Sequence, residues 1–192
     1  MNVYDFDGTI YDGDSSVDFF LYALKQKPPL LRYVPRQVWG FILYGLKHIN
    51  KTELKEYFFS FLSGIDVAIL TEDFWNQNQY RIYKWYLEQQ QPDDIIISAS
   101  PEFLLKPICQ RLGIHHLIAS EVDSETGMFT GENCRGQEKV QRLESEYNVN
   151  HIDTFYSDSL SDRPLAEIAD KAFLVDKGVV REWKGLYNHE QR

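Results

Sequence analysis

The spacing of hydrophobic and polar positions changes along the chain. Val3-Tyr4 is a short apolar run typical of a buried strand, and polar residues follow it directly. From about residue 15 to residue 90, apolar residues recur at helical spacing instead of alternating. Pro35 indicates a kink or boundary in this stretch, and Asn50 with Glu53 resembles a capping box. The pattern predicts one strand followed by helices over 15–24, 28–46, 50–64 and 67–90.

Beyond Pro92 the pattern alternates between strands and helices. Ile95-Ile96-Ile97 is a β-branched run typical of a strand buried on both faces. Ser100 is suited to a helix N-cap and Pro101 to the first helical position. The chain then predicts a helix to 112, a strand over 116–120, a hairpin over 122–131, a helix over 137–147, a strand over 152–157, a helix over 161–169 and a strand over 171–175. Such alternation predicts an α/β fold with a parallel sheet and helices on both faces.

The opening strand is expected to join this sheet, which makes the helical block an insertion. Residues 1–14 and 91–192 then form the α/β core, and residues 15–90 form a helical cap above the carboxyl edge of the sheet. With 192 residues, of which 43% are hydrophobic, the chain can bury one core plus a small inserted module.

Two carboxylates follow the first predicted strand, in the run Asp5-Phe6-Asp7-Gly8-Thr9. Residues i and i+2 of a strand point the same way, so Asp5 and Asp7 converge if the strand continues. Gly8 lets the backbone approach a ligand closely. Like charges this near each other need a counter-charge, usually a metal. A solvated Asp-Gly turn is the simpler alternative for this run taken alone.

Polar residues also follow two other predicted strands. Ser98 ends one of them, and Ser157, Asp158 and Asp162 follow another. Ligands of open α/β sheets bind beyond the carboxyl ends of the strands. The sequence therefore predicts a phosphate and metal site at this edge.

Four segments in order resemble the motifs of the haloacid dehalogenase-like (HAD) superfamily. They are Asp5–Thr9, Ile97–Ser100, Lys139 and Tyr156–Asp162. The resemblance spans the chain and is closest to subfamily IB, the phosphoserine-phosphatase-like hydrolases. It implies a Rossmann-like, doubly wound, mostly parallel sheet core with an inserted α-helical cap.

The resemblance also implies a role for each acidic residue. Asp5 would be the nucleophile that forms an aspartyl-phosphate, and Asp7 the general acid and then the general base. Mg²⁺ would be held by Asp5, by the main-chain carbonyl of Asp7 and by Asp158, because hard oxygen ligands suit this ion. Asp162 would orient a metal-bound water or Lys139.

The remaining motif residues are expected to hold the phosphoryl group. Ser98 and the amide of Ala99 would donate hydrogen bonds to phosphate oxygens, and Gly8 and Thr9 belong to the same predicted phosphate site. Lys139 would neutralise the phosphoryl charge. Without the ordered match to the family motifs, Lys139 would be interpreted as an exposed lysine on a helix surface, and this is the alternative.

Substrate choice is expected to lie with the cap. Asp14 stands nine residues after Asp5, where phosphoserine phosphatases use an acidic residue to grip the substrate amine, but no matching arginine is evident. The segment from Phe20 to Lys55 holds seven basic residues against Glu53, which favours an anionic substrate or contact with a membrane surface. A solvated face over a hydrophobic cap core is an equal alternative. The large area that aromatic side chains bury favours a place in the cap core over stacking on a substrate for Trp39, Tyr44, Phe58, Trp75 and Trp85.

Net charge, cysteines and histidines indicate which partners and which cellular compartment the sequence favours. The net charge of −9 argues against nucleic acid as a main partner. Cys109 and Cys134 are expected to be reduced thiols, one buried on a helix and one in a loop. The adjacent His115 and His116 face opposite ways on a strand and predict no metal site. The absence of a signal-like N-terminus or a long apolar run predicts a cytoplasmic protein, and the polar segment 181–192 is expected to fray.

The sequence predicts a magnesium-dependent phosphatase that hydrolyses a small phosphorylated metabolite. A phosphotransferase or phosphomutase of the same superfamily is the first alternative. A phospho-ligand binding module without turnover is the second. The oligomeric state is open.

Overall fold

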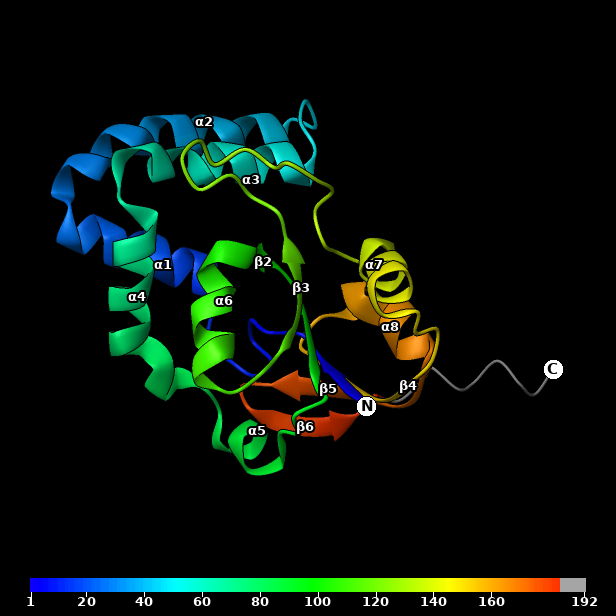
Figure 1. Ribbon diagram of the computed structural model, residues 1–192. Helices are drawn as coiled ribbons and strands as arrows, with labels where there is room; N and C mark the ends of the chain where they lie inside the picture. Colours follow the sequence, from blue (N-terminus) through cyan, green and yellow to red (C-terminus); the bar gives the residue numbers. More distant parts are fainter. Residues whose placement is uncertain (184–192) are drawn as a thin grey trace.

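Residues 1–183, which the computed structural model describes, contain one sheet of six strands (Figure 1). The strand order is β3-β2-β1-β4-β5-β6. All neighbours pair in parallel except β5 and β6, which pair antiparallel. The bounds are β1 Asn2–Tyr4, β2 Ile95–Pro101, β3 His116–Ser120, β4 Ile152–Ser157, β5 Ala169–Asp176 and β6 Val179–Glu182.

Alternate residues of the central strands enter two separate cores. Tyr4 and Ile96 belong to an aromatic cluster that also contains Leu104 of α6 (Glu102–Arg111). Val3 and Ile97 belong to a second cluster, with apolar residues of α7 (Gln137–Tyr147) and α8 (Arg163–Glu167). Since strand side chains alternate between faces, helices cover both faces of the sheet. This confirms the predicted mostly parallel, doubly wound α/β fold.

The chain between β1 and β2 forms five α-helices joined by short 3₁₀ turns. They are α1 Ser15–Gln26, α2 Val34–Gly45, α3 Lys51–Phe59, α4 Val67–Asn78 and α5 Lys84–Gln89. The capping box of Asn50 and Glu53 starts α3 as predicted. Pro35 stands in the first turn of α2, and so it marks a boundary and not a kink.

The single helix predicted over 67–90 is wrong in its middle. Ile82 and Tyr83 are extended there, because Tyr83 N donates to Ile10 O (2.9 Å) and Ile82 bridges to Tyr11. These contacts with the loop after β1 override the helical spacing of apolar residues. They also fix the end of the insertion against that loop.

Two parts of the insertion differ in what they contact. α1 and α4 contribute Phe19, Phe74 and Trp75 to the aromatic cluster of the sheet, and Trp75 Nε1 donates to Leu104 O (2.6 Å). α2 and α3 lie together at one end of the molecule, away from the sheet (Figure 1). The aromatic core is thus continuous from the insertion into the sheet.

Three further expectations need correction. β2 continues to Pro101, so Ser100 belongs to the strand and is no helix N-cap. The segment 122–131 forms an isolated bridge between Val122 and Phe129 in place of a full hairpin ladder. Arg181 and Glu182, expected in a fraying tail, belong to β6, while the rest of that prediction lies mostly outside the described residues.

Other sequence predictions agree with the structure. Cys109 in α6 and Cys134 in a loop are both buried and free. Among residues 1–183 no helix is both long enough and apolar enough to span a bilayer.

Candidate active site

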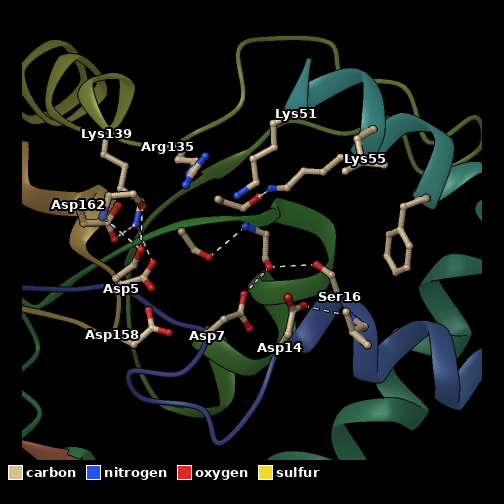
Figure 2. A pocket seen from close by; sticks show the side chains of 18 of the residues that line it. Asp5, Asp7, Asp14, Ser16, Lys51, Lys55, Arg135, Lys139, Asp158 and Asp162 are labelled. Atoms are coloured by element: carbon tan, nitrogen blue, oxygen red, sulfur yellow. Dashed lines mark hydrogen bonds and ion pairs between the residues drawn. The ribbon is translucent and has the colours of Figure 1, made fainter. Parts of the chain in front are cut away.

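The carboxyl ends of β1, β2 and β4 border a cavity of about 340 Å³ (Figure 2). We call the residues at the strand ends and beside them the floor of the cavity: Asp5, Asp7, Ser98, Ala99, Ser100, Lys139, Asp158 and Asp162. We call the residues of α2 and α3, with one loop arginine, the roof: Phe41, Lys51, Leu54, Lys55, Phe58 and Arg135. Figure 2 shows the carboxylates on one side of the cavity and Lys51, Lys55 and Arg135 on the other.

Lys139 lies between two carboxylates of the floor. Its Nζ donates to Asp5 Oδ1 and to Asp162 Oδ2, both at 2.7 Å, and its side chain is 2% exposed. Burial alone would lower the pKa of Lys139, but the charges of Asp5 and Asp162 outweigh burial and raise this pKa above its usual value. The alternative of an exposed helix lysine is wrong.

Asp5 itself is buried at the end of β1. Burial raises the pKa of Asp5 to about 7, and the nearby Asp162 and Asp7 act in the same direction, while Lys139 opposes them. Asp162 Oδ2 accepts hydrogen bonds from Lys139 Nζ at 2.7 Å and from Ser157 Oγ at 2.9 Å. These contacts agree with a role of Asp162 in orienting Lys139, and that role stays a prediction.

Asp7 is held by hydrogen bonds that the sequence analysis missed. Ser100 Oγ donates to Asp7 Oδ2 at 2.5 Å, and Ser15 N donates to Asp7 Oδ1 at 2.7 Å. Burial raises the pKa of Asp7 to about 6, Asp14 acts in the same direction, and these hydrogen bonds limit the rise. The sequence analysis missed this contact because it assigned Ser100 to a helix N-cap. In the structure Ser100 belongs to β2, and its side chain binds Asp7 instead of capping a helix.

Gly8 and Thr9 place Asp158 at the cavity. Asp158 N donates to Thr9 Oγ1 at 2.9 Å. Gly8 has a φ of +70°, and a Cβ there would lie 2.3 Å from Asp158 Oδ2, so only glycine leaves room for this carboxylate. Neither Gly8 nor Thr9 lines the 340 Å³ cavity, within the part of the chain that the structure describes. Their observed contacts are with Asp158, and a phosphate contact stays a prediction.

Ser98, Ala99 and Asp14 all line the cavity. Ser98 Oγ accepts a hydrogen bond from Ser100 N (3.1 Å), and Ala99 O accepts one from Lys55 Nζ (2.7 Å). Asp14 is the N-cap of α1, where its carboxylate accepts from Val17 N at 3.0 Å. Asp14 therefore has a structural role that does not depend on a substrate.

Three cations of the roof were not singled out as site residues. Lys55 Nζ donates to Ala99 O and to Asn133 Oδ1 (3.1 Å), and burial lowers the pKa of Lys55 to about 8. Burial and the neighbouring Arg135 also lower the pKa of Lys51. The excess of basic residues between Phe20 and Lys55 was the signal for the two lysines. No comparable signal distinguishes Arg135.

The floor can hold a magnesium ion with few protein ligands. Within the described residues no three His, Cys, Asp or Glu side chains converge as a complete ligand set. Mg²⁺ is usually bound through one or two carboxylates and keeps several waters. Asp5 and Asp158 both line the cavity, and among the described residues no basic side chain lies within ion-pair distance of Asp158. The two carboxylates, with waters in the remaining positions, fit this ion.

Comparison with known proteins agrees with this geometry. The family model "haloacid dehalogenase-like hydrolase" matches residues 3–167. A Mycobacterium tuberculosis protein named "probable phosphatase" is 28% identical over 204 residues, covering 93% of this chain and 70% of its own.

Two solved structures have a similar fold. A Bordetella pertussis protein of unknown function has a TM-score of 0.71 at 19% identity, covering 90% of this chain and 87% of its own. A phosphoserine phosphohydrolase-like protein from Francisella tularensis has a TM-score of 0.58 at 17% identity, covering 89% and 84%. The chain is thus phosphoserine-phosphatase-like in fold, and its family and relatives together support a phosphatase. Since one family model spans the inserted helices and the sheet strands up to β4, most of the chain, this chain belongs to the haloacid dehalogenase-like hydrolase family.

Proposed function

We propose that this protein is a magnesium-dependent phosphatase that hydrolyses a small phosphomonoester through an aspartyl-phosphate on Asp5. The observation that carries the proposal is the buried Asp5, which is bound by Lys139 and lies beside a second carboxyl group, Asp7, with a raised pKa. Phosphoester cleavage needs an ionised nucleophile and a protonatable acid in one cavity. The positive charge of Lys139 lowers the pKa of Asp5 and so favours the ionised form of this nucleophile.

In the first step an oxygen of Asp5 attacks phosphorus and the bond from phosphorus to the leaving oxygen breaks. Lys139 holds Asp5 Oδ1, which leaves Oδ2 to attack, and its charge offsets the repulsion between carboxylate and phosphate. Asp7 gives its proton to the leaving oxygen, which departs as an alcohol. A pKa of about 6 suits this step, because part of Asp7 is protonated near neutral pH.

In the second step a water hydrolyses the aspartyl-phosphate. Asp7, now ionised, takes a proton from the water while the water oxygen attacks phosphorus. The bond from phosphorus to the Asp5 oxygen breaks, and inorganic phosphate leaves. Asp7 ends protonated and Asp5 ionised, so the site returns to its starting state.

Mg²⁺ would be held by Asp5, Asp158 and the main-chain carbonyl of Asp7. When bound, it supplies positive charge that offsets the negative charge of the phosphoryl group. Ser98 and Ala99 line the cavity, which supports the proposal that the Ser98 hydroxyl and the Ala99 amide donate hydrogen bonds to phosphate oxygens.

For the substrate we propose a leaving group that carries further negative charge and an apolar part. Lys51, Lys55 and Arg135 favour an anion in the roof, and Phe41 and Phe58 offer apolar contact beside them. This cation excess disfavours a leaving group whose recognition depends on an amine. In this proposal residues 15–90 act as the cap that selects the substrate for the core of residues 1–14 and 91–192. The cytoplasmic location stays a prediction.

The test is hydrolysis of p-nitrophenyl phosphate by wild type, Asp5→Asn and the exposed control Asp93→Asn. We expect Asp5→Asn to abolish turnover and Asp93→Asn to leave it unchanged. EDTA should silence the wild type, and added Mg²⁺ should restore it. Turnover by Asp5→Asn would remove Asp5 as the nucleophile.

A screen of phosphorylated metabolites with added alcohol acceptors then separates hydrolysis from transfer. Release of inorganic phosphate in step with substrate loss supports a phosphatase. Phosphorylated acceptor would indicate a phosphotransferase, and binding without turnover would indicate a binding module.

A further inference from the structure

The helix α2 buries its polar and small residues and exposes its large apolar ones. Gln37 and Gly40 are its buried residues. Gln37 Nε2 donates to Phe58 O at 2.8 Å, and a Cβ on Gly40 would lie 2.5 Å from Tyr57 Cβ, so this face packs closely on α3. A surface helix of a soluble globule normally shows the opposite arrangement.

The exposed apolar side chains of α2 share one side of the helix. Val38, Trp39, Phe41 and Ile42, which we call the outer face of α2, are between 45% and 56% exposed. Their spacing of three and four residues makes them neighbours on the helix surface. Leu31 before the helix and Leu46 after it are exposed as well. Single exposed apolar residues are ordinary, but a contiguous group indicates an interaction surface.

Basic residues flank the outer face in a chain that is acidic overall. Arg32 and Arg36 precede it, Lys47 follows it, and all three are exposed. The segment from Phe20 to Lys55 has seven basic residues and one acidic residue, whereas the chain has a net charge of −9. That one acid, Glu53, is engaged in the capping box of α3, where it accepts from Asn50 N at 2.7 Å. The surface therefore combines apolar residues with positive charge.

The outer face lies at the edge of the molecule and borders the cavity. α2 forms the outermost layer above α3, away from the sheet (Figure 1). Phe41 belongs to the outer face and also lines the cavity. Whatever covers the outer face is thus adjacent to the cavity.

We propose that the outer face of α2 docks on the surface of an anionic lipid bilayer. Trp39, Phe41 and Ile42 enter the boundary between head groups and acyl chains, while Arg32 and Lys47 contact lipid phosphates. Aromatic and aliphatic residues flanked by lysine and arginine are the composition of helices that lie in this interface. The helix lies on the membrane and does not cross it, because 12 residues span about 18 Å against about 30 Å of hydrocarbon.

Charge argues against a second copy of the chain as the occupant. A two-fold interface centred on the outer face would bring Arg32, Arg36 and Lys47 of both copies together without acidic partners from this segment. An anionic bilayer satisfies the same charges. The docking proposal is independent of the proposed phosphatase activity, and its test measures binding and not turnover.

The test is co-sedimentation of the full chain with phosphatidylcholine vesicles that contain or lack phosphatidylglycerol. We expect binding to the anionic vesicles at low ionic strength, and a large loss of binding at high salt, because salt screens exposed charges. No binding to anionic vesicles at low salt overturns the proposal, whether or not the protein hydrolyses phosphoesters.

Paired variants separate docking from general surface changes. Trp39→Ser with Ile42→Ser should weaken binding by about tenfold or more, as should Arg32→Gln with Lys47→Gln. Ile69→Ser on α4, where Ile69 is 63% exposed, and Lys84→Gln with Lys106→Gln should leave binding unchanged. Equal losses in these controls would overturn the assignment to α2. Unchanged circular dichroism and thermal unfolding confirm that the variants fold.

Trp39 also reports docking directly. Trp75 and Trp183 are buried, whereas Trp39 is 54% exposed, so its emission should shift to the blue when anionic vesicles are added. Trp39→Phe should keep the binding and lose most of this shift. If the protein instead forms a dimer that Trp39→Ser with Ile42→Ser abolishes, and no vesicle binds, the outer face is a self-association surface and the proposal is wrong.

Discussion

The floor and the roof of the cavity are built in opposite ways. The floor is polar yet buried, and its groups bind one another: Lys139 with Asp5 and Asp162, and Ser100 with Asp7. The roof carries three cations and part of an apolar helix whose large residues face outward. A preorganised floor suits a fixed reaction, because charge is stabilised there without rearrangement. A roof that combines cations with apolar side chains suits the choice of substrate and surface.

Loss of Lys139 should produce the largest effect on activity and stability, because it removes the cation that binds two carboxylates of the floor. Lys139→Met leaves the buried carboxylates of Asp5 and Asp162 without their cation. We expect kcat/KM to fall by about 10³-fold and the free energy of unfolding to fall by about 3 kcal/mol. Steady-state kinetics and urea unfolding measure the two effects. The exposed Lys106→Met is the matched control, and equal behaviour of both variants would contradict the assigned role.

Asp7→Asn should slow the enzyme by about 10²- to 10⁴-fold on an alkyl phosphate. The loss should be smaller on p-nitrophenyl phosphate, whose leaving oxygen needs little protonation. Comparison of kcat for both substrates in both proteins measures this difference. Equal losses on the two substrates would show that Asp7 is not the general acid.

Ser100→Ala should change the pH profile more than the rate. The hydrogen bond from Ser100 stabilises the ionised Asp7 carboxylate, so its loss raises the pKa of Asp7 further above its present value of about 6. The general acid works when protonated, and the alkaline limb of kcat/KM should therefore move to higher pH. Ser145→Ala on the exposed side of α7 is the control, and an unmoved limb in Ser100→Ala would contradict the coupling.

The contrast between floor and roof also decided what the sequence could predict. Asp5, Asp7 and Asp158 were predicted because each follows a strand end, and the strand ends themselves follow from hydrophobic spacing. Lys139 was predicted only from its place in the order of the motifs that resemble the HAD superfamily. Ser100 was assigned to a helix N-cap, whereas the pairing of Pro101 with Ser120 extends β2 past it. Local propensity does not show such pairing between strands, so the end of the strand was predicted too early.

The roof was less predictable because tertiary contacts set it. Arg135 reaches the cavity from a loop, and nothing in its local sequence indicates this. The break at Ile82 depends on pairing with Tyr11, some seventy residues away in sequence, which a local helical pattern cannot show. The basic and aromatic composition of the insertion was visible, but not that α2 turns its apolar residues outward.

Lys55→Gln should affect the roof alone, with a smaller loss of kcat/KM than Lys139→Met or Asp7→Asn. The amide keeps a hydrogen bond donor for Ala99 O but removes the charge. We expect kcat/KM to fall by about tenfold for substrates with an anionic leaving group, mainly through KM. The p-nitrophenyl group of p-nitrophenyl phosphate carries no charge in the substrate, so kcat/KM for this substrate should change little. A loss of equal size on both substrates would place Lys55 in the chemistry of the floor.

The smallest expected effect distinguishes exposed from buried aromatic residues in the insertion. Trp39→Phe should change the free energy of unfolding by less than about 0.5 kcal/mol, because Trp39 is 54% exposed and no hydrogen bond holds it among the described residues. Trp75→Phe should cost about 1–3 kcal/mol, since it opens a buried space and leaves Leu104 O without its donor. Urea unfolding of both variants measures the difference. If Trp39→Phe costs as much as Trp75→Phe, the outer face of α2 is part of the folded core, and it is not available to dock on a membrane.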